Sequence, residues 1–176
     1  MRSPRIPLPS ALRHLPRRRG PAPSIAVRYP CLQVEQMSPL EIRRALIDKV
    51  CFPGVTLVPV GELGLDMPAV ALVLSEELAQ GQPEAFFRGR AFALVRLDGS
   101  IELRLPPEWA RPVLRRGWGT IHPLARYLAG AVPPQSFIIY APRTLEEVRA
   151  VTKIVAASYW YARGEVAGTP LPGSAW

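Results

Sequence analysis

The stretch that decides the fold reads RRGWGTIHPLARYLAG over residues 115–130 and, after a proline-containing spacer, SFIIYAPRTLEEVRAVTKIVAASYWYARG over residues 136–164. Ser136 to Tyr140 predicts a short strand that turns into a long helix. Thr144 and Glu147 form a capping box at the start of this helix, and Gly164 suits its end. Apolar side chains recur at helical spacing, which predicts a face long enough to cover a sheet: Leu145, Val148, Val151, Val155, Tyr159 and Ala162.

Upstream of this stretch the pattern favours strands. Val55 to Val60 and Ala69 to Leu74 are rich in valine and leucine and are bounded by glycine or proline. Residues 92–97 and 100–105 flank Asp98-Gly99, a strong signal for a hairpin with a two-residue loop. That loop would place Leu94 opposite Leu103 and would turn Leu94 and Arg96 toward the apolar face. Arg96 would then lie at the rim with its head in water, or in a pocket facing an anion.

These elements predict a single α+β domain over residues 37–168, with a mainly antiparallel sheet packed by the long C-terminal helix and by shorter helices. One short helix is expected from Pro39 to about Val50, with Ser38 as its cap and Pro39 at the first helical position. Another follows Pro106-Pro107. Residues 169–176 are expected to form a loose C-terminal tail.

Residues 1–36 carry seven prolines, seven arginines and one acid, Glu35, and have no sustained apolar period. This composition predicts a basic and mostly disordered tail. Two alternatives stay open: Met37 is the true start, or the arginines belong to an organelle-targeting signal. Without such targeting, we expect a cytoplasmic protein.

Charge and cysteine content exclude several classes of function. The net charge of +8 lies mainly in residues 1–36, so the near-neutral body argues against a nucleic-acid groove. The sequence contains no apolar run of 18 residues, so no membrane span is predicted. Cys31 and Cys51 have no metal-ligand spacing and are expected to be free thiols. Nothing in the pattern indicates an oligomeric state.

The candidate site lies at the turn that precedes the long helix. Gly117-Trp118-Gly119 is followed by His122-Pro123, and His122 would stand at the start of a short helix ending at Gly130. His122 is the one histidine outside residues 1–36. Considered alone, His122 has two possible roles: it caps or packs against the helix, or it acts as a base or ligand.

These residues resemble the luciferase-like domain family, which includes the fungal luciferases. The resemblance rests on GWGTIHPLA, the two prolines, YAPRTLEE and the tyrosine-containing helix. It extends upstream through ALIDKV, PGVT and LSEELAQGQPEAFFRGRAFALVRLDGSIELRLPPEWA, and so covers about residues 40–165.

The resemblance implies an oxygenase. Fungal members add O2 to an enolisable pyrone, 3-hydroxyhispidin, without a metal or flavin cofactor, and emit light as the peroxide loses CO2. The partner would be a small aromatic or pyrone-like molecule. His122 would be the catalytic base or orienting group, and the candidate substrate contacts are Leu94, Arg96, Trp118, Tyr140 and Arg143.

The chain departs from the family on the first hairpin strand. Relatives carry a Glu-x-x-His-x-His pattern there, and the matching positions are Ala91, Leu94 and Arg96. With one histidine left, no metal cluster is expected. Two functions therefore stay open: a cofactor-independent oxygenase that acts through His122, or a non-catalytic relative that binds a small molecule or a protein.

Overall fold

The structure is a computed structural model that describes residues 6–128, 130 and 132–171. Its centre is a six-stranded sheet in the order β1-β2-β3-β4-β6-β5, in which all neighbours are antiparallel. The strands are β1 (Val55–Pro59), β2 (Ala69–Leu74), β3 (Ala91–Arg96), β4 (Ile101–Arg104), β5 (Gly119–Ile121) and β6 (Ser136–Ile139). The expected α+β class is confirmed.

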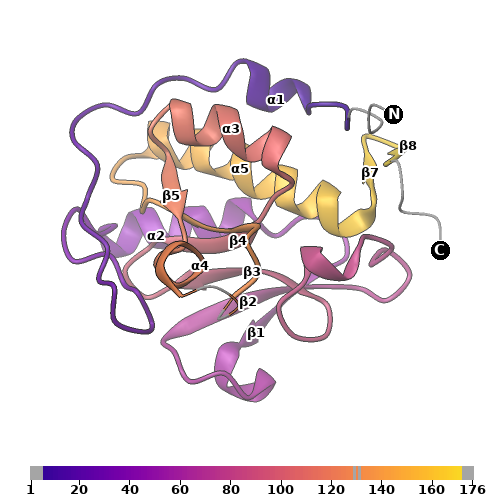
Figure 1. Ribbon diagram of the computed structural model, residues 1–176, viewed down its shortest axis with the longest axis horizontal. Coiled ribbons are helices and arrows are strands. Elements are labelled where there is room, and N and C mark those ends of the chain that lie inside the picture. The colour runs from indigo at the N-terminus through magenta and orange to yellow at the C-terminus, as the bar shows by residue number, and fades with distance from the viewer. Residues whose placement is uncertain (1–5, 129, 131, 172–176) are drawn as a thin grey trace.

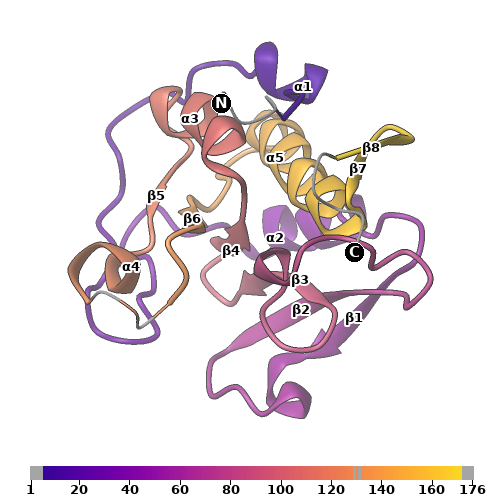
Figure 2. The ribbon, with the colours of Figure 1, turned by 45° about the vertical axis from the view of Figure 1, so that its right-hand side comes forward.

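Helices cover one face of this sheet (Figures 1 and 2). They are α1 (Ser10–Arg13), α2 (Leu40–Lys49), α3 (Pro107–Arg115) and α5 (Leu145–Arg163), whereas α4 (Pro123–Tyr127) lies apart from them. Two short 3-10 turns, η1 (Val60–Leu63) and η2 (Pro83–Ala85), complete the set. Of the described helices, none is long and apolar enough to cross a membrane.

The long helix α5 is the central packing element, as predicted. The Thr144 hydroxyl accepts a hydrogen bond from the Glu147 amide, and Gly164 ends the helix at a φ of 73°. Five of the six predicted apolar positions are buried, and Leu145 is exposed. The helix packs on β3 and β4 and also contacts α1 and α2.

The hairpin forms where it was expected, but the predicted register is wrong by one residue. Leu94 lies opposite Glu102, and Ala93 lies opposite Leu103. The loop has three residues because the Asp98 carboxylate accepts a hydrogen bond from the Ser100 amide while Gly99 adopts a φ of 88°. Since side chains alternate along a strand, this shift brings Glu102 rather than Leu103 to the face of Leu94.

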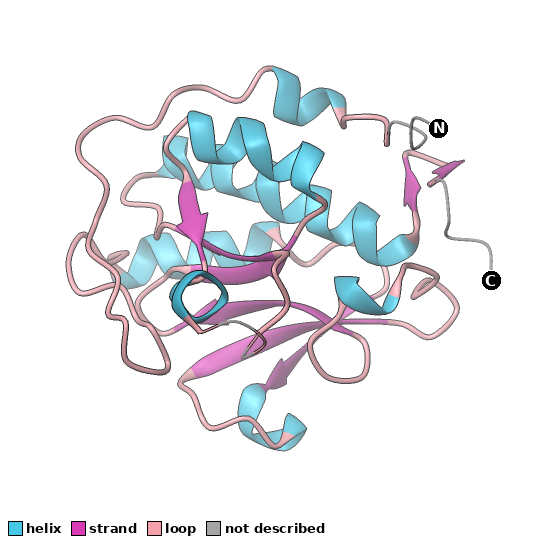
Figure 3. Cartoon of the chain, viewed as in Figure 1, coloured by secondary structure: helices cyan, strands magenta, loops and turns pink. Residues whose placement is uncertain are grey.

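The N-terminal segment, residues 6–36, is ordered in the structure, whereas its composition predicted disorder. It runs from α1 along the outside of the domain and past α4 to α2, almost entirely as loop (Figures 1 and 3). Leu12, Leu15 and Cys31 are buried. Two domain indoles donate to its carbonyls, from Trp109 to Pro7 and from Trp118 to Pro16. The domain thus supplies the hydrogen bonds and apolar contacts that the segment cannot make within itself.

The structure also differs from expectation at the start of α2 and after the end of α5. The Ser38 hydroxyl donates to the Pro142 carbonyl instead of capping α2. After α5 the chain forms the small hairpin of β7 (Glu165–Val166) and β8 (Thr169–Pro170), and Leu171 is buried. The rest of the expected C-terminal tail, residues 172–176, lies outside the described residues.

Candidate functional site

The candidate site lies on the sheet face that α5 leaves uncovered. Across that face Leu94 on β3 neighbours Glu102 on β4, and Glu102 neighbours Ile138 on β6. His122 follows directly after the edge strand β5, whose Thr120 pairs with Ile138. The topology therefore carries residues from four strands to one place.

A cavity of about 180 Å³ opens on this face, and we call it the His122 cavity. Its polar lining includes Glu102, Arg104 and His122. The other walls are largely apolar and come from the β3 strand, the loops before it and the residues around α4: Leu65, Met67, Phe87, Leu94, Leu124 and Val132. A few polar groups in an apolar concave surface are typical of a small-molecule site.

His122 is held by the helix that it begins. Its Nδ1 accepts a hydrogen bond of 3.1 Å from the Leu124 amide, and its own amide donates to the Ser136 carbonyl. Because Nδ1 is an acceptor, the neutral ring carries its proton on Nε2. That Nε2 lies 3.5 Å from Oε1 of Glu102. The expected capping role of His122 is therefore confirmed, and the other ring nitrogen faces a carboxylate.

Burial sets the protonation of this pair. The side chains of His122 and Glu102 are 3% and 8% exposed. Burial, followed by the charges of Arg96 and Arg104, lowers the pKa of His122 to about 4. Burial also raises the pKa of Glu102, although the same two arginines oppose that rise. At neutral pH the imidazole is uncharged, and the carboxylate is the more basic partner.

Arg104 brings a fixed positive charge to the same cavity. Its guanidinium lies 4.4 Å from the centroid of the Phe87 ring, and it donates a 2.9 Å hydrogen bond to the Phe86 carbonyl. Burial lowers the pKa of Arg104, and the Glu102 charge opposes that change. The site can therefore accept a proton at Glu102 and stabilise a nearby anion with Arg104.

Of the predicted site residues, Leu94 joins His122 in the cavity, but Arg96 does not line it. Arg96 is completely buried, so its head does not lie in water at the rim of the sheet. Its Nε donates to the Ser100 hydroxyl, and its two terminal nitrogens donate to the carbonyls of Pro30 and Cys31. Arg96 thus binds the N-terminal segment.

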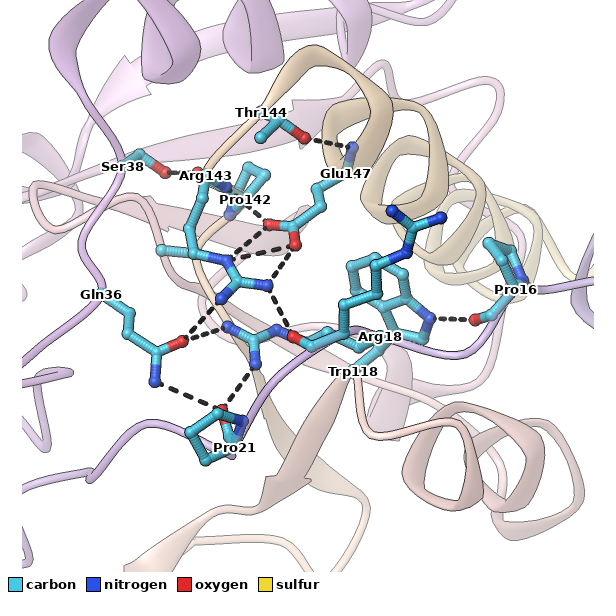
Figure 4. Close-up of polar contacts among 12 residues, drawn as sticks. Pro16, Arg18, Pro21, Gln36, Ser38, Trp118, Pro142, Arg143, Thr144 and Glu147 are labelled. Atoms are coloured by element: carbon cyan, nitrogen blue, oxygen red, sulfur yellow. Dashed lines mark hydrogen bonds and ion pairs between the residues drawn. The ribbon is translucent and has the colours of Figure 1, made fainter.

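The other three predicted substrate contacts lie away from the His122 cavity. Trp118 is buried below the N-terminal segment, and Tyr140 lines a separate hollow with Thr120 and Tyr127. Arg143 pairs with Glu147 and donates to the Gln36 side chain and the Arg19 carbonyl (Figure 4). The structure therefore places Trp118 and Arg143 where the N-terminal segment docks.

Glu102 and Arg104 line the cavity but were not among the predicted site residues. The predicted two-residue loop placed Leu94 on the face of Leu103, so its true neighbours across the strands, Glu102 and Arg104, were not connected with the site. The signal that could have found them is the alternation of Glu102 and Arg104 with Ile101 and Leu103 along β4. Within the described residues, no three His, Cys, Asp or Glu side chains come close enough to hold a metal ion.

Fold and site together define an α+β domain with a buried carboxylate–imidazole pair at a mainly apolar cavity. Residues 89–158, from the start of β3 into α5, match the family described as Luciferase domain. This match confirms, for residues 89–158, the resemblance noted in the sequence.

Fungal luciferases are among the similar proteins. The chain is 39% identical to the luciferase of Neonothopanus nambi over 71 residues, which are 40% of this chain and 27% of that protein. It is 38% identical to the luciferase of Armillaria ostoyae over 74 residues, which are 42% of this chain and 28% of that protein. The chain thus matches about a quarter of the length of these curated relatives. No solved structure matches it.

Proposed function

We propose that this protein is an oxygenase of the luciferase-like family that acts on an enolisable aromatic or pyrone substrate in the His122 cavity, with O2 as co-substrate and without an organic or metal cofactor. The observation that carries the proposal is the buried Glu102–His122 pair beside Arg104. It provides a base and a cation that are largely shielded from solvent, which is what reaction of an enol with O2 requires.

In this proposal Glu102 is the base, and His122 positions it. His122 cannot readily accept a proton on Nδ1, because that atom already accepts the Leu124 amide. Its Nε2 carries the ring proton and faces Glu102. The enol proton therefore passes to the Glu102 carboxylate, whose raised pKa brings it closer to the acidity of an enol. Arg104 stabilises the resulting enolate and the peroxide that forms when the enolate adds O2.

The size of the cavity limits how a substrate binds. Sites for drug-sized ligands commonly measure about 300–1,000 Å³, whereas the His122 cavity is about 180 Å³. It is suited to a single ring with its reacting enol. The rest of a styrylpyrone such as 3-hydroxyhispidin would extend past the mouth of the cavity.

The test uses the full chain and 3-hydroxyhispidin in air, with light, substrate loss and O2 uptake recorded together. We expect turnover by the wild type, and we expect Glu102→Gln to lower kcat by about 10²- to 10⁴-fold because it removes the base while keeping the shape. Glu76→Gln, at an exposed loop position, is the matched control and should retain full activity.

Two results would contradict the proposal. Wild type that consumes neither O2 nor substrate at high protein concentration would favour the non-catalytic alternative. Unchanged turnover in Glu102→Gln would show that the base lies elsewhere.

A further inference from the structure

Part of the wall of the His122 cavity comes from the N-terminal segment, far before the region matched to the luciferase family. Tyr29 lines the cavity together with Glu102 and His122, although it lies 60 residues before the start of that match at residue 89. The Tyr29 side chain is only half-buried, since 52% of the residue remains exposed. It therefore lies at the mouth of the cavity, where the outer part of a ligand would pass.

Tyr29 stands at the end of a loop that is hydrogen-bonded across its base. We call residues 24–34 the tip loop. Its two sides are joined by hydrogen bonds from the Ala26 amide to the Leu32 carbonyl and from the Val34 amide to the Ser24 carbonyl. The Cys31 amide donates to the Arg28 carbonyl and closes the turn that carries Tyr29. The loop thus has a defined shape, although it contains only an isolated bridge between Ile25 and Gln33.

Buried polar groups of the domain hold this loop in place. The Asp98 carboxylate accepts a 2.7 Å hydrogen bond from the Gln33 amide, and the Gln33 side chain accepts one from the Ala141 amide. At the turn, Arg96 donates to the Pro30 carbonyl at 2.7 Å and to the Cys31 carbonyl at 3.0 Å. The two residues that directly follow Tyr29 are therefore fixed by one guanidinium.

We propose that the tip loop is part of the substrate site, in which Tyr29 forms the outer wall and contacts the aromatic ligand while Arg96 is the positioning residue that holds Tyr29 there. This inference rests on the proposed function for the identity of the ligand. It assigns a role to an arginine that is completely buried and does not line the cavity itself. A planar guanidinium can bind two carbonyls at once, which an imidazole cannot do in the same plane.

The electrostatic surroundings of Tyr29 agree with this placement. Burial and the nearby Glu102 charge raise the pKa of the Tyr29 hydroxyl, so the side chain stays neutral and remains a hydrogen-bond donor at physiological pH. The proposed role of Tyr29 is contact with the ligand's aromatic system, and it takes no part in proton transfer.

The test measures binding and turnover separately. Binding of 3-hydroxyhispidin is followed by its fluorescence under argon, and kcat and KM are measured in air. An aromatic pair commonly contributes enough for a 3- to 10-fold change in affinity. We therefore expect Tyr29→Ala to raise both Kd and KM by about 3- to 10-fold with little change in kcat, and Tyr29→Phe to stay close to wild type. Val27→Ala is the control, because Val27 is exposed on the same loop and does not line the cavity.

Arg96→Lys tests the positioning role. The variant keeps the charge but loses the two-carbonyl contact, so amide hydrogen exchange at Ala26 and Val34 should speed up, and KM should rise as it does in Tyr29→Ala. Adding Tyr29→Ala to Arg96→Lys should raise KM no further, because both changes remove the same wall. Thermal unfolding of Arg96→Lys checks that the domain is folded. Independent, multiplying effects of the two changes on KM would overturn the positioning role.

The outcomes separate this inference from the proposed function. Turnover with Kd and KM unchanged in Tyr29→Ala overturns the inference alone. Binding that weakens in Tyr29→Ala, without any turnover by the wild type, supports the inference and overturns the oxygenase proposal. Absence of any binding by the wild type overturns both.

Discussion

The docking of the N-terminal segment can be tested by truncating the side chain of Leu12. Leu12 lies in α1, which contacts α3 and α5, and it is 1% exposed. Leu→Ala removes the equivalent of about three methylene groups, or about 2–3 kcal/mol of burial at 0.8 kcal/mol each. A cavity left behind can raise such a loss to about 5 kcal/mol in a rigid core.

We expect the lower value for Leu12→Ala, about 2–3 kcal/mol, because α1 is a short peripheral helix whose surroundings can relax. The loss also cannot exceed the free energy with which residues 6–36 dock on the domain, since beyond that point the segment would detach. The same reasoning predicts a similar loss for Leu15→Ala, whose side chain is equally buried.

Urea unfolding followed by tryptophan fluorescence gives the free-energy difference, and hydrogen exchange over residues 8–20 reports local detachment. Arg13→Ala is the matched control, because Arg13 lies next to Leu12 in the same helix with an exposed side chain. A change below about 0.5 kcal/mol in Leu12→Ala, equal to that of the control, would refute the docking and restore the tail predicted from composition.

Two further predictions concern the imidazole and the chain packed against α5. The pKa of folded His122, about 4, lies below its ordinary value of 6.5, so the unfolded chain binds more protons between these pH values, and acid should destabilise the fold. The comparison is with His122→Asn, which retains a helix-capping side chain. Relative to this variant, wild type should lose about 2–3 kcal/mol of unfolding free energy between pH 7 and 4.5. A difference in unfolding free energy that stays constant across this pH range would contradict the lowered pKa. Gly81→Ala should cost about 1–3 kcal/mol, because the added Cβ would stand 2.3 Å from the Tyr161 carbonyl oxygen. Gly61→Ala, whose Cβ would meet nothing within 4 Å, should stay within about 0.5 kcal/mol of wild type in the same thermal or urea unfolding experiment, and equal stability of the two variants would show that Gly81 has more room than its backbone contacts indicate.

Local patterns predicted much of the fold. The start and end of α5 follow from Thr144 and Gly164, whose capping contacts involve only neighbouring residues. Strand β2 has the predicted bounds, Ala69–Leu74. A short apolar run bounded by turn residues is typical of a buried strand. His122 was also placed correctly at the start of α4. In each case the decisive interactions lie within a few residues along the chain.

The candidate site was only half predictable. The pattern around His122 indicated one polar group, but its partner depended on the hairpin register. That register is set by Asp98, whose carboxylate binds Ser100 nearby and also Gln33, which is 65 residues away in the chain. The contact with Gln33 cannot be predicted from the Asp-Gly dipeptide alone. The one-residue difference places Leu94 on the face of Glu102 rather than on the face of Leu103.

The sequence by itself determined where α5, strand β2 and the β3–β4 hairpin form, because capping, turn chemistry and apolar period act over short distances. Only the tertiary structure decided that Glu102 faces His122 and that residues 6–36 are ordered. Both outcomes depend on groups remote in the chain satisfying each other's hydrogen bonds, as Arg96 does for the carbonyls of Pro30 and Cys31. The composition of residues 6–36 therefore predicts disorder, because it contains no information about the buried donors elsewhere in the chain that bind the carbonyls of this segment.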